Sequence, residues 1–132
     1  MEDLMLFEIL KEMQNKYSCI VEIECITREI GESLSRNDRT SAQMLLGMRQ
    51  EEMDQADIHD RNMKYLISAL SPAEAFRVRE WQKGNEGEKP LSPNAEKLVE
   101  KGKDLWAVLK RTIEADRLIS TRLAGKDSYY RE

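Results

Sequence analysis

Residues 6–34 decide the fold, and they read LFEILKEMQNKYSCIVEIECITREIGESL without a proline. Apolar side chains recur through this stretch at the spacing of one helical face. These are Leu6, Leu10, Met13, Tyr17, Ile20, Ile23, Ile30 and Leu34. The pattern predicts one helix over about residues 2–35, roughly 45–50 Å long at about 1.5 Å per residue.

A short polar break, residues 36–40, separates this helix from a second one. Asp38 and Thr40 each suit the N-cap position, and Thr40 with Gln43 has the spacing of a capping box. We expect the second helix over residues 39–70. Because the loop is so short, the two helices should be antiparallel neighbours.

Two Ser-Pro pairs mark the starts of two further helices. The sequence SPAE at residues 71–74 combines a serine cap, a proline at the first helical position and a glutamate that can close the box. It opens a short helix, residues 72–83. The second pair opens a long helix, residues 93–124, which Gly125 should end. Residues 84–92, GNEGEKPLS, have the composition of a flexible linker.

The composition agrees with a helical fold. The 132 residues include only 6 glycines and 3 prolines, 35% are charged and 6% are aromatic, which is typical of long helices with solvated outer faces. A chain of this length suits one domain. We predict a single all-α domain, an elongated antiparallel helical bundle of three long helices and one short helix.

Charge and hydropathy exclude several classes of protein. The net charge of −4 argues against nonspecific nucleic-acid binding. Charged residues interrupt every apolar run before the ~18 residues that a membrane span needs, and the first residues are acidic where a secretory signal would be basic. We therefore expect no membrane insertion and a cytoplasmic location, with Cys19 and Cys25 as reduced thiols in the core.

The ends of the chain differ in charge. Residues 1–35 carry a net charge of −5 and residues 93–132 a net charge of +2. This difference favours the first and last helices lying side by side, although solvent screening weakens the argument.

The densest acidic patch is a stripe of Glu51, Asp54, Asp57 and Asp60, with Glu52 beside it. Metal-dependent all-α nucleotide pyrophosphohydrolases hold Mg²⁺ with carboxylates from two facing helices. No second helix offers a matching acidic cluster, so we expect a solvated face and keep the hydrolase as an alternative function.

His59, the one histidine, has no carboxylate or thiol three or four residues away and is expected in a polar layer. Polar residues also interrupt the apolar seams of the other long helices, at Thr27 and at Thr112 with Asp116. Phosphate-binding loops and nucleophile–histidine–acid arrangements are absent from the sequence. We expect no catalytic residue, no metal site and no cofactor.

The last helix has more apolar surface than one seam requires. Val99, Trp106 and Ile113 are spaced by seven and form a second stripe beside the seam. This stripe is either buried in the bundle or a docking face for a partner helix. Six of the seven methionines fall on the first two helices, where they fill a core or supply an adaptable surface.

The layout resembles the FlgN-like flagellar export chaperones, small proteins made of long antiparallel helices. The similarity lies in the long last helix and in the first hairpin. The matching hairpin residues are Leu10, Met13, Tyr17, Ile20, Ile26, Thr27, Leu34, Asn37, Asp38, Leu45, Leu46 and Arg49. The chain is short for that family, and its last helix is not rich in Asn and Gln.

The resemblance implies a chaperone that binds hook-associated proteins, the hook–filament junction proteins, before type III export. In that family the C-terminal helix receives the substrate, which here points to Val99, Trp106, Leu109, Ile113 and Leu123. The export apparatus is a further candidate partner. A structural or homo-oligomeric coiled-coil protein is left open as a second alternative.

Overall fold

The computed structural model describes residues 3–88 and 90–130, with side chains described as far as residue 121. Its described residues form four helices and no strand, which confirms the all-α prediction. The helices are α1 (Asp3–Ser35), α2 (Arg39–Ser68), α3 (Pro72–Gln82) and α4 (Pro93–Tyr130). The expected stop at Gly125 is wrong, because the backbone of α4 stays helical through it.

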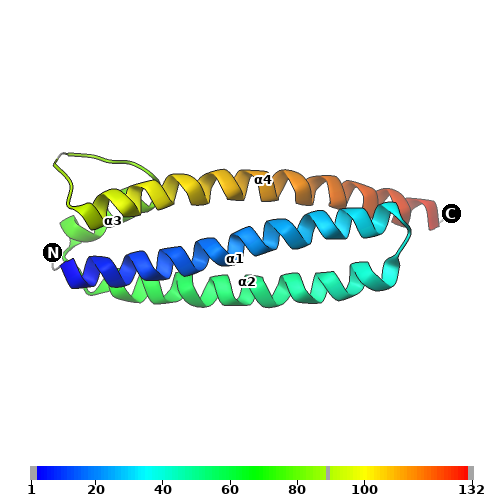
Figure 1. Ribbon diagram of the computed structural model, residues 1–132, viewed down its shortest axis with the longest axis horizontal. Coiled ribbons are helices and arrows are strands. Elements are labelled where there is room, and N and C mark those ends of the chain that lie inside the picture. The colour runs from blue at the N-terminus through cyan, green and yellow to red at the C-terminus, as the bar shows by residue number, and fades with distance from the viewer. Residues whose placement is uncertain (1–2, 89, 131–132) are drawn as a thin grey trace.

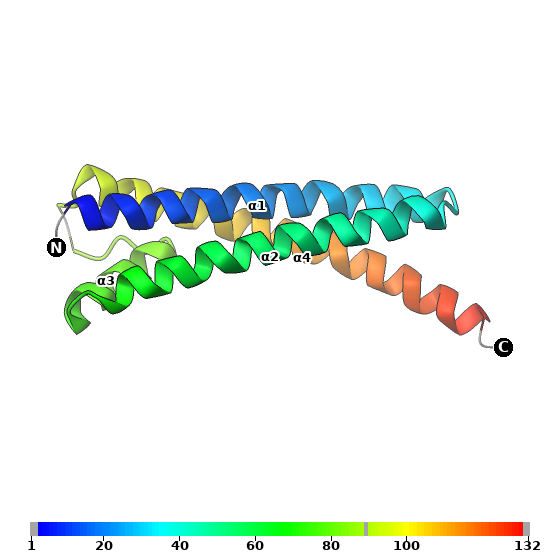
Figure 2. The ribbon, with the colours of Figure 1, turned by 90° about the horizontal axis from the view of Figure 1, so that it is seen from below.

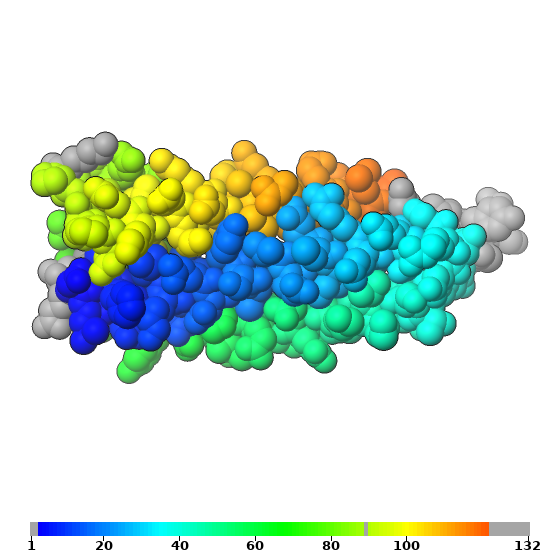
Figure 3. Space-filling view, viewed as in Figure 1, coloured from blue at the N-terminus to red at the C-terminus, as the bar shows by residue number. Residues whose placement is uncertain are grey.

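α1 is the central helix. Figure 1 shows α2 returning alongside α1 in the opposite direction and α4 running along the other side of α1 in the same direction as α1. α1 packs against both of these helices, and α3 packs mainly against α4. Among the described residues, no Cα atom of α2 lies within 8 Å of one in α4. In the view of Figure 3, α1 covers the front between them.

The turn between α1 and α2 is fixed by two caps. Asn37 has the left-handed φ of 58° that follows a helix end, and the Asp38 N–H donates to the Ser33 carbonyl at 2.8 Å. Asp38 then caps α2, since its carboxylate accepts from the Ser41 N–H at 3.0 Å. The alternative cap at Thr40 is wrong, because α2 has already begun before it.

α3 is capped at both ends, and the cap at its start is the one that the sequence predicts. The Ser71 hydroxyl accepts from the Glu74 N–H at 3.3 Å, and Glu74 accepts from the Ser71 N–H, which completes the capping box. Gly84, with a φ of 88°, ends the helix, and the Asn85 N–H donates back to the Glu80 carbonyl at 2.9 Å.

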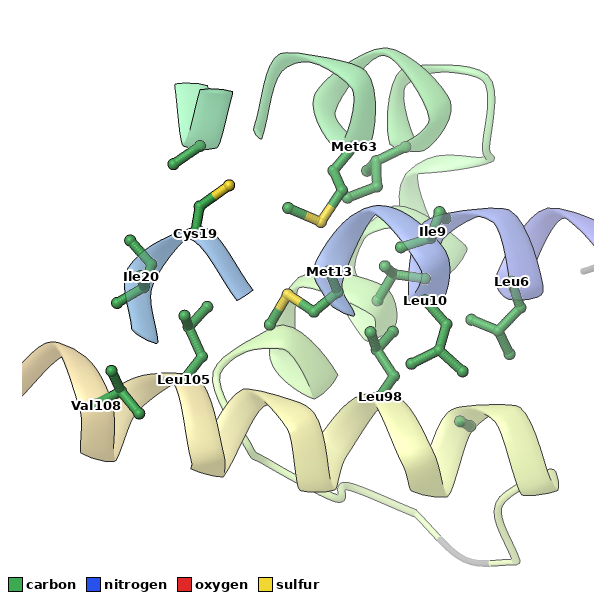
Figure 4. Close-up of a cluster of buried hydrophobic side chains, with 14 of the residues drawn as sticks. Leu6, Ile9, Leu10, Met13, Cys19, Ile20, Met63, Leu98, Leu105 and Val108 are labelled. Carbon is green, nitrogen blue, oxygen red and sulfur yellow. The ribbon is translucent and has the colours of Figure 1, made fainter. Parts of the chain in front are cut away.

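The main core lies at the end of the molecule where α3 joins the three long helices. Figure 4 shows Leu98, Leu105 and Val108 of α4 pointing at the apolar side chains of α1. The buried members of this core are Leu6, Ile9, Leu10, Met13, Cys19, Ile20, Ile23, Ala56, Met63, Ile67, Ala75, Val78, Ala95, Leu98, Leu105 and Val108.

α3 and α4 approach closely at Gly102. A Cβ atom there would lie 2.5 Å from the Gln82 carbonyl oxygen and 2.8 Å from that of Trp81. Both oxygens belong to the backbone at the end of α3 and cannot rotate away. Glycine is therefore the residue that lets the end of α3 rest on α4.

A smaller core lies near the α1–α2 turn. It consists of Ile26, Ile30, Leu34, Ala42, Leu45 and Ile119. Only Ile119 among these comes from α4, and Figure 2 shows that helix diverging from α1 and α2 toward its C-terminal end. Among the described side chains, α4 therefore contributes more residues to the main core than to the smaller one.

Candidate functional site

The exposed apolar surface of α4 is centred on Trp106 and Ile113. Their side chains are 57% and 53% exposed, although each could bury a large apolar area. Leu109 lies between them on the same side of the helix, half-buried at the edge of the main core. Trp106 and Ile113 are two of twelve large apolar side chains that are exposed among the described residues, and they lie in line two turns apart on α4. A contiguous row of such side chains can form an interaction surface.

Val99, the first member of the predicted stripe, is not part of this surface. Its side chain is only 3% exposed, and it lines a recess with Pro90 and Leu91 of the linker. Val99 is therefore not exposed to a partner in this structure, because residues of the segment between α3 and α4 lie beside it.

That linker segment, predicted to be flexible, makes specific contacts with α3 and α4. The Trp81 indole N–H donates to the Glu86 carbonyl at 3.2 Å. The Glu86 carboxylate lies 3.9 Å from the Lys103 ammonium of α4. Leu91 packs against the main core.

Leu123, the last predicted binding residue, lies on the helical backbone of α4, but its side chain is outside the described residues. Its exposure and neighbours therefore stay a prediction. Of the five predicted residues, the structure brings Trp106, Leu109 and Ile113 together on one side of α4.

A polar bridge connects this side of α4 with α2. The Arg49 guanidinium donates to the Asp116 carboxylate at 2.7 Å and, with the same nitrogen, to the Thr27 hydroxyl of α1 at 3.2 Å. Thr27 is fully buried. Arg49 of α2 therefore connects the two predicted polar residues, Thr27 of α1 and Asp116 of α4.

Arg49 also shows which residues of α2 share this side. Leu46 is three residues before Arg49 and Met53 is four after it, so both lie on its side of the helix, and both are exposed. Ile113 lies one turn before Asp116 on α4 in the same way. We call the set of Leu46, Met53, Trp106, Leu109 and Ile113 the α2–α4 face.

Sequence reasoning missed Leu46 and Arg49 as functional candidates. Arg49 falls four residues after Leu45 and seven before Ala56, both of which are buried seam positions. A charged residue at a seam position is the signal that could have found it, because a buried cation requires a partner.

A second ion pair links α1 to α4 further along the bundle. The Arg111 guanidinium donates to the Glu24 carboxylate at 2.9 Å, and Arg28 donates to it at 3.3 Å. The hydrogen bond from Arg111, together with the contribution of Arg28, outweighs the effect of burial and holds the pKa of Glu24 below its usual range.

The acidic stripe of α2 does not gather into a metal site. Glu51, Asp54 and Asp57 are exposed, while Asp60 bridges Lys16 at 3.1 Å and Lys64 at 3.0 Å. Among the described side chains, those of residues 3–88 and 90–121, no group of three or more His, Cys, Asp or Glu is arranged to hold a metal ion.

His59 belongs to a polar contact between α1 and α2. Its Nδ1 lies 2.7 Å from the Glu12 carboxylate, which also accepts from the Asn62 amide at 3.3 Å. Glu52, which lies beside the acidic stripe in the sequence, is half-buried and adjoins the Cys19 thiol. Burial, followed by the charge of Glu52, raises the pKa of Cys19.

Both cysteines are free thiols, but only one is in the core. Cys19 is buried and Cys25 is exposed. The expectation of two core thiols is therefore wrong for Cys25, because the outer side of α1 faces water at that turn.

Three of the methionines on α2 are exposed. They are Met44, Met48 and Met53, whereas Met13 of α1 and Met63 of α2 are fully buried in the main core. Met48 follows the buried seam residue Leu45 by three positions but is itself 43% exposed. The methionines therefore serve both as core filling and as surface.

Comparison with known proteins finds no matching family model, no matching curated protein and no matching solved structure. No helix over the described residues combines the length and apolar character that crossing a membrane requires.

Proposed function

We propose that this chain is a non-catalytic, cytoplasmic export chaperone. In this proposal it is an elongated helical bundle, with α1 antiparallel to α2 and parallel to α4, whose α2–α4 face binds an amphipathic helical segment of a secreted protein. The resemblance to FlgN-like chaperones makes hook-associated proteins the expected substrates and the export apparatus a second partner.

The observation that carries the proposal is the exposure of Trp106 and Ile113 on one side of α4. Burying an apolar side chain of this size contributes about 1.5–3 kcal/mol, and tryptophan is enriched among the residues that dominate binding interfaces. Exposed Met53 adds an unbranched, polarizable side chain that can adapt to different partners.

The test is capture of partners from the source cell by the wild-type chain and by Trp106→Glu. We expect hook-associated proteins in the wild-type eluate and their loss with the variant. Because Trp106 is exposed, the variant should stay helical by circular dichroism. A Tyr65→Glu variant is the matched control, since Tyr65 is 77% exposed on a different side of α2 and its replacement adds the same charge.

Three results would contradict the proposal. The first is an eluate that contains only ribosomal or metabolic proteins. The second is loss of partners with Tyr65→Glu as well. The third is a stable homodimer in sedimentation that Trp106→Glu converts to monomer, which would assign the face to a second copy of the chain.

A further inference from the structure

A basic stripe runs along α4 beside the α2–α4 face. Lys103, Lys110 and Arg117 are exposed and spaced by seven residues, so they fall nearly in line along the helix. Trp106 and Ile113 are also seven residues apart. Trp106 lies four residues before Lys110, and Ile113 lies four residues before Arg117. The apolar residues therefore occupy the a positions of a heptad and the cations occupy the neighbouring e positions.

The remaining positions of this heptad separate a solvent-exposed side of α4 from a buried side. Leu109 and Asp116 take the d positions, and Leu105 and Ile119, buried against α1, take two of the g positions. One flank of the apolar stripe is thus covered by the bundle itself. The other flank, the one that a docked helix would contact, carries three positive charges.

The present partners of these cations hold them only weakly. Lys103 lies 3.9 Å from Glu86, which is half-buried, and Arg117 lies 3.1 Å from Glu114. Lys103, Arg117 and Glu114 are exposed. Exposed pairs of this kind contribute about 0–1 kcal/mol. The Lys110 ammonium sits 5.5 Å from the centre of the Trp106 ring, next to the apolar centre of the face.

We propose that the helix received on the α2–α4 face is acidic along the edge that lies against α4. This inference rests on the proposed function and names the chemistry of the partner: an amphipathic helix whose apolar stripe is bordered on one side by Glu or Asp. Charges at e and g positions select partners in helix pairs, because like charges in register repel and opposite charges attract.

The edge of the partner that lies toward α2 meets charges of both signs. Asp57 follows Met53 by one turn and is exposed, and Arg61, one turn further along α2, is exposed as well. This edge therefore sets no sign for the partner. The charge preference of the face comes from the cations of α4.

The test uses two synthetic three-heptad peptides with a leucine stripe, labelled for fluorescence anisotropy. One has Glu along one edge and Gln along the other, and the second has Lys in place of every Glu. We expect the Glu peptide to bind about tenfold more tightly, from three exposed pairs of modest strength. Its affinity should fall with added salt, since exposed charges are screened.

A charge-reversed variant sharpens the test. With Lys103→Glu, Lys110→Glu and Arg117→Glu combined, the order of the two peptides should reverse, while helicity by circular dichroism stays unchanged because all three side chains are exposed. Trp106→Glu should weaken both peptides.

Each remaining outcome decides a different question. Equal binding of the two peptides to the wild type, lost with Trp106→Glu, would overturn the acidic preference and leave the docking function intact. Binding of the Glu peptide that is unchanged by the charge reversal would also overturn the preference. Failure of both peptides to bind would overturn the docking function together with this inference.

Discussion

The two ends of the bundle hold α4 in different ways. At the end that contains α3, Leu98, Leu105 and Val108 are buried in the main core and Gly102 touches the backbone of α3. Near the α1–α2 turn, Ile119 is the one residue of α4 in the smaller core among the side chains described, which extend to residue 121. The α2–α4 face lies between these ends, so a partner would bind where α4 passes from tightly packed to loosely held (Figure 2).

The largest effect should follow from truncating α4 in the main core. Leu98→Ala removes a fully buried side chain and should lower the free energy of unfolding by about 3 kcal/mol. Ile119→Ala should lower the free energy of unfolding by less than Leu98→Ala does. Its effect should be local, with faster amide hydrogen exchange in the C-terminal half of α4. Urea unfolding and native-state exchange measure the two effects. Uniformly faster exchange in the Ile119 variant would contradict the difference between the ends.

The contact between α3 and α4 can be tested with a pair of glycines. Gly102→Ala should lower the free energy of unfolding by about 1–2 kcal/mol, because the added methyl group meets two backbone oxygens. Gly47→Ala is the control, because Gly47 lies within α2 and a Cβ atom there would meet nothing within 4 Å. This substitution should raise the free energy of unfolding by about 0.5–1 kcal/mol. Similar effects of the two changes would show that α3 does not rest on α4.

The bridge between α2 and α4 should have a smaller effect. Arg49→Met keeps the length of the side chain and removes its hydrogen bonds to Asp116 and Thr27, at a cost of about 1 kcal/mol. A double-mutant cycle with Asp116→Ala isolates the pair. A coupling energy of zero would mean that the two helices are held only by their separate contacts with α1.

The smallest effect concerns pH. The pKa of Glu24 is lower in the folded chain than its ordinary value of 4.5, chiefly through the hydrogen bond from Arg111. Its contribution to stability is therefore complete above pH 4.5 and is lost as the pH falls through the folded pKa. Glu24→Gln should flatten this part of the stability profile. Thermal unfolding between neutral and acidic pH measures it, and an unchanged profile would contradict the assignment.

The helices themselves could be read from the sequence because their signals are local. Ser71 with Glu74 predicts the start of α3, and the structure has that capping box. The periodic residues of 6–34 predict α1, and most of them are buried in the two cores. A cap or a period depends on neighbours within about one helical turn, which is information that a single sequence contains.

The composition of the exposed face could not be read in the same way. Val99, Trp106 and Ile113 are equivalent by spacing, yet Val99 is covered by the linker and the other two are exposed. Likewise, the sequence does not show that Arg49 reaches both Thr27 and Asp116, residues from two other helices. Such contacts depend on how distant segments approach one another.

The sequence by itself thus determined the all-α class, the caps and the excess of apolar surface on α4. Only the tertiary structure decided which part of that surface stays in water and which cations border it. The physical reason is that helix formation is a local equilibrium of backbone and neighbouring side chains. Exposure of one position on a helix depends on the packing of every other segment, including here a linker that folds back over Val99.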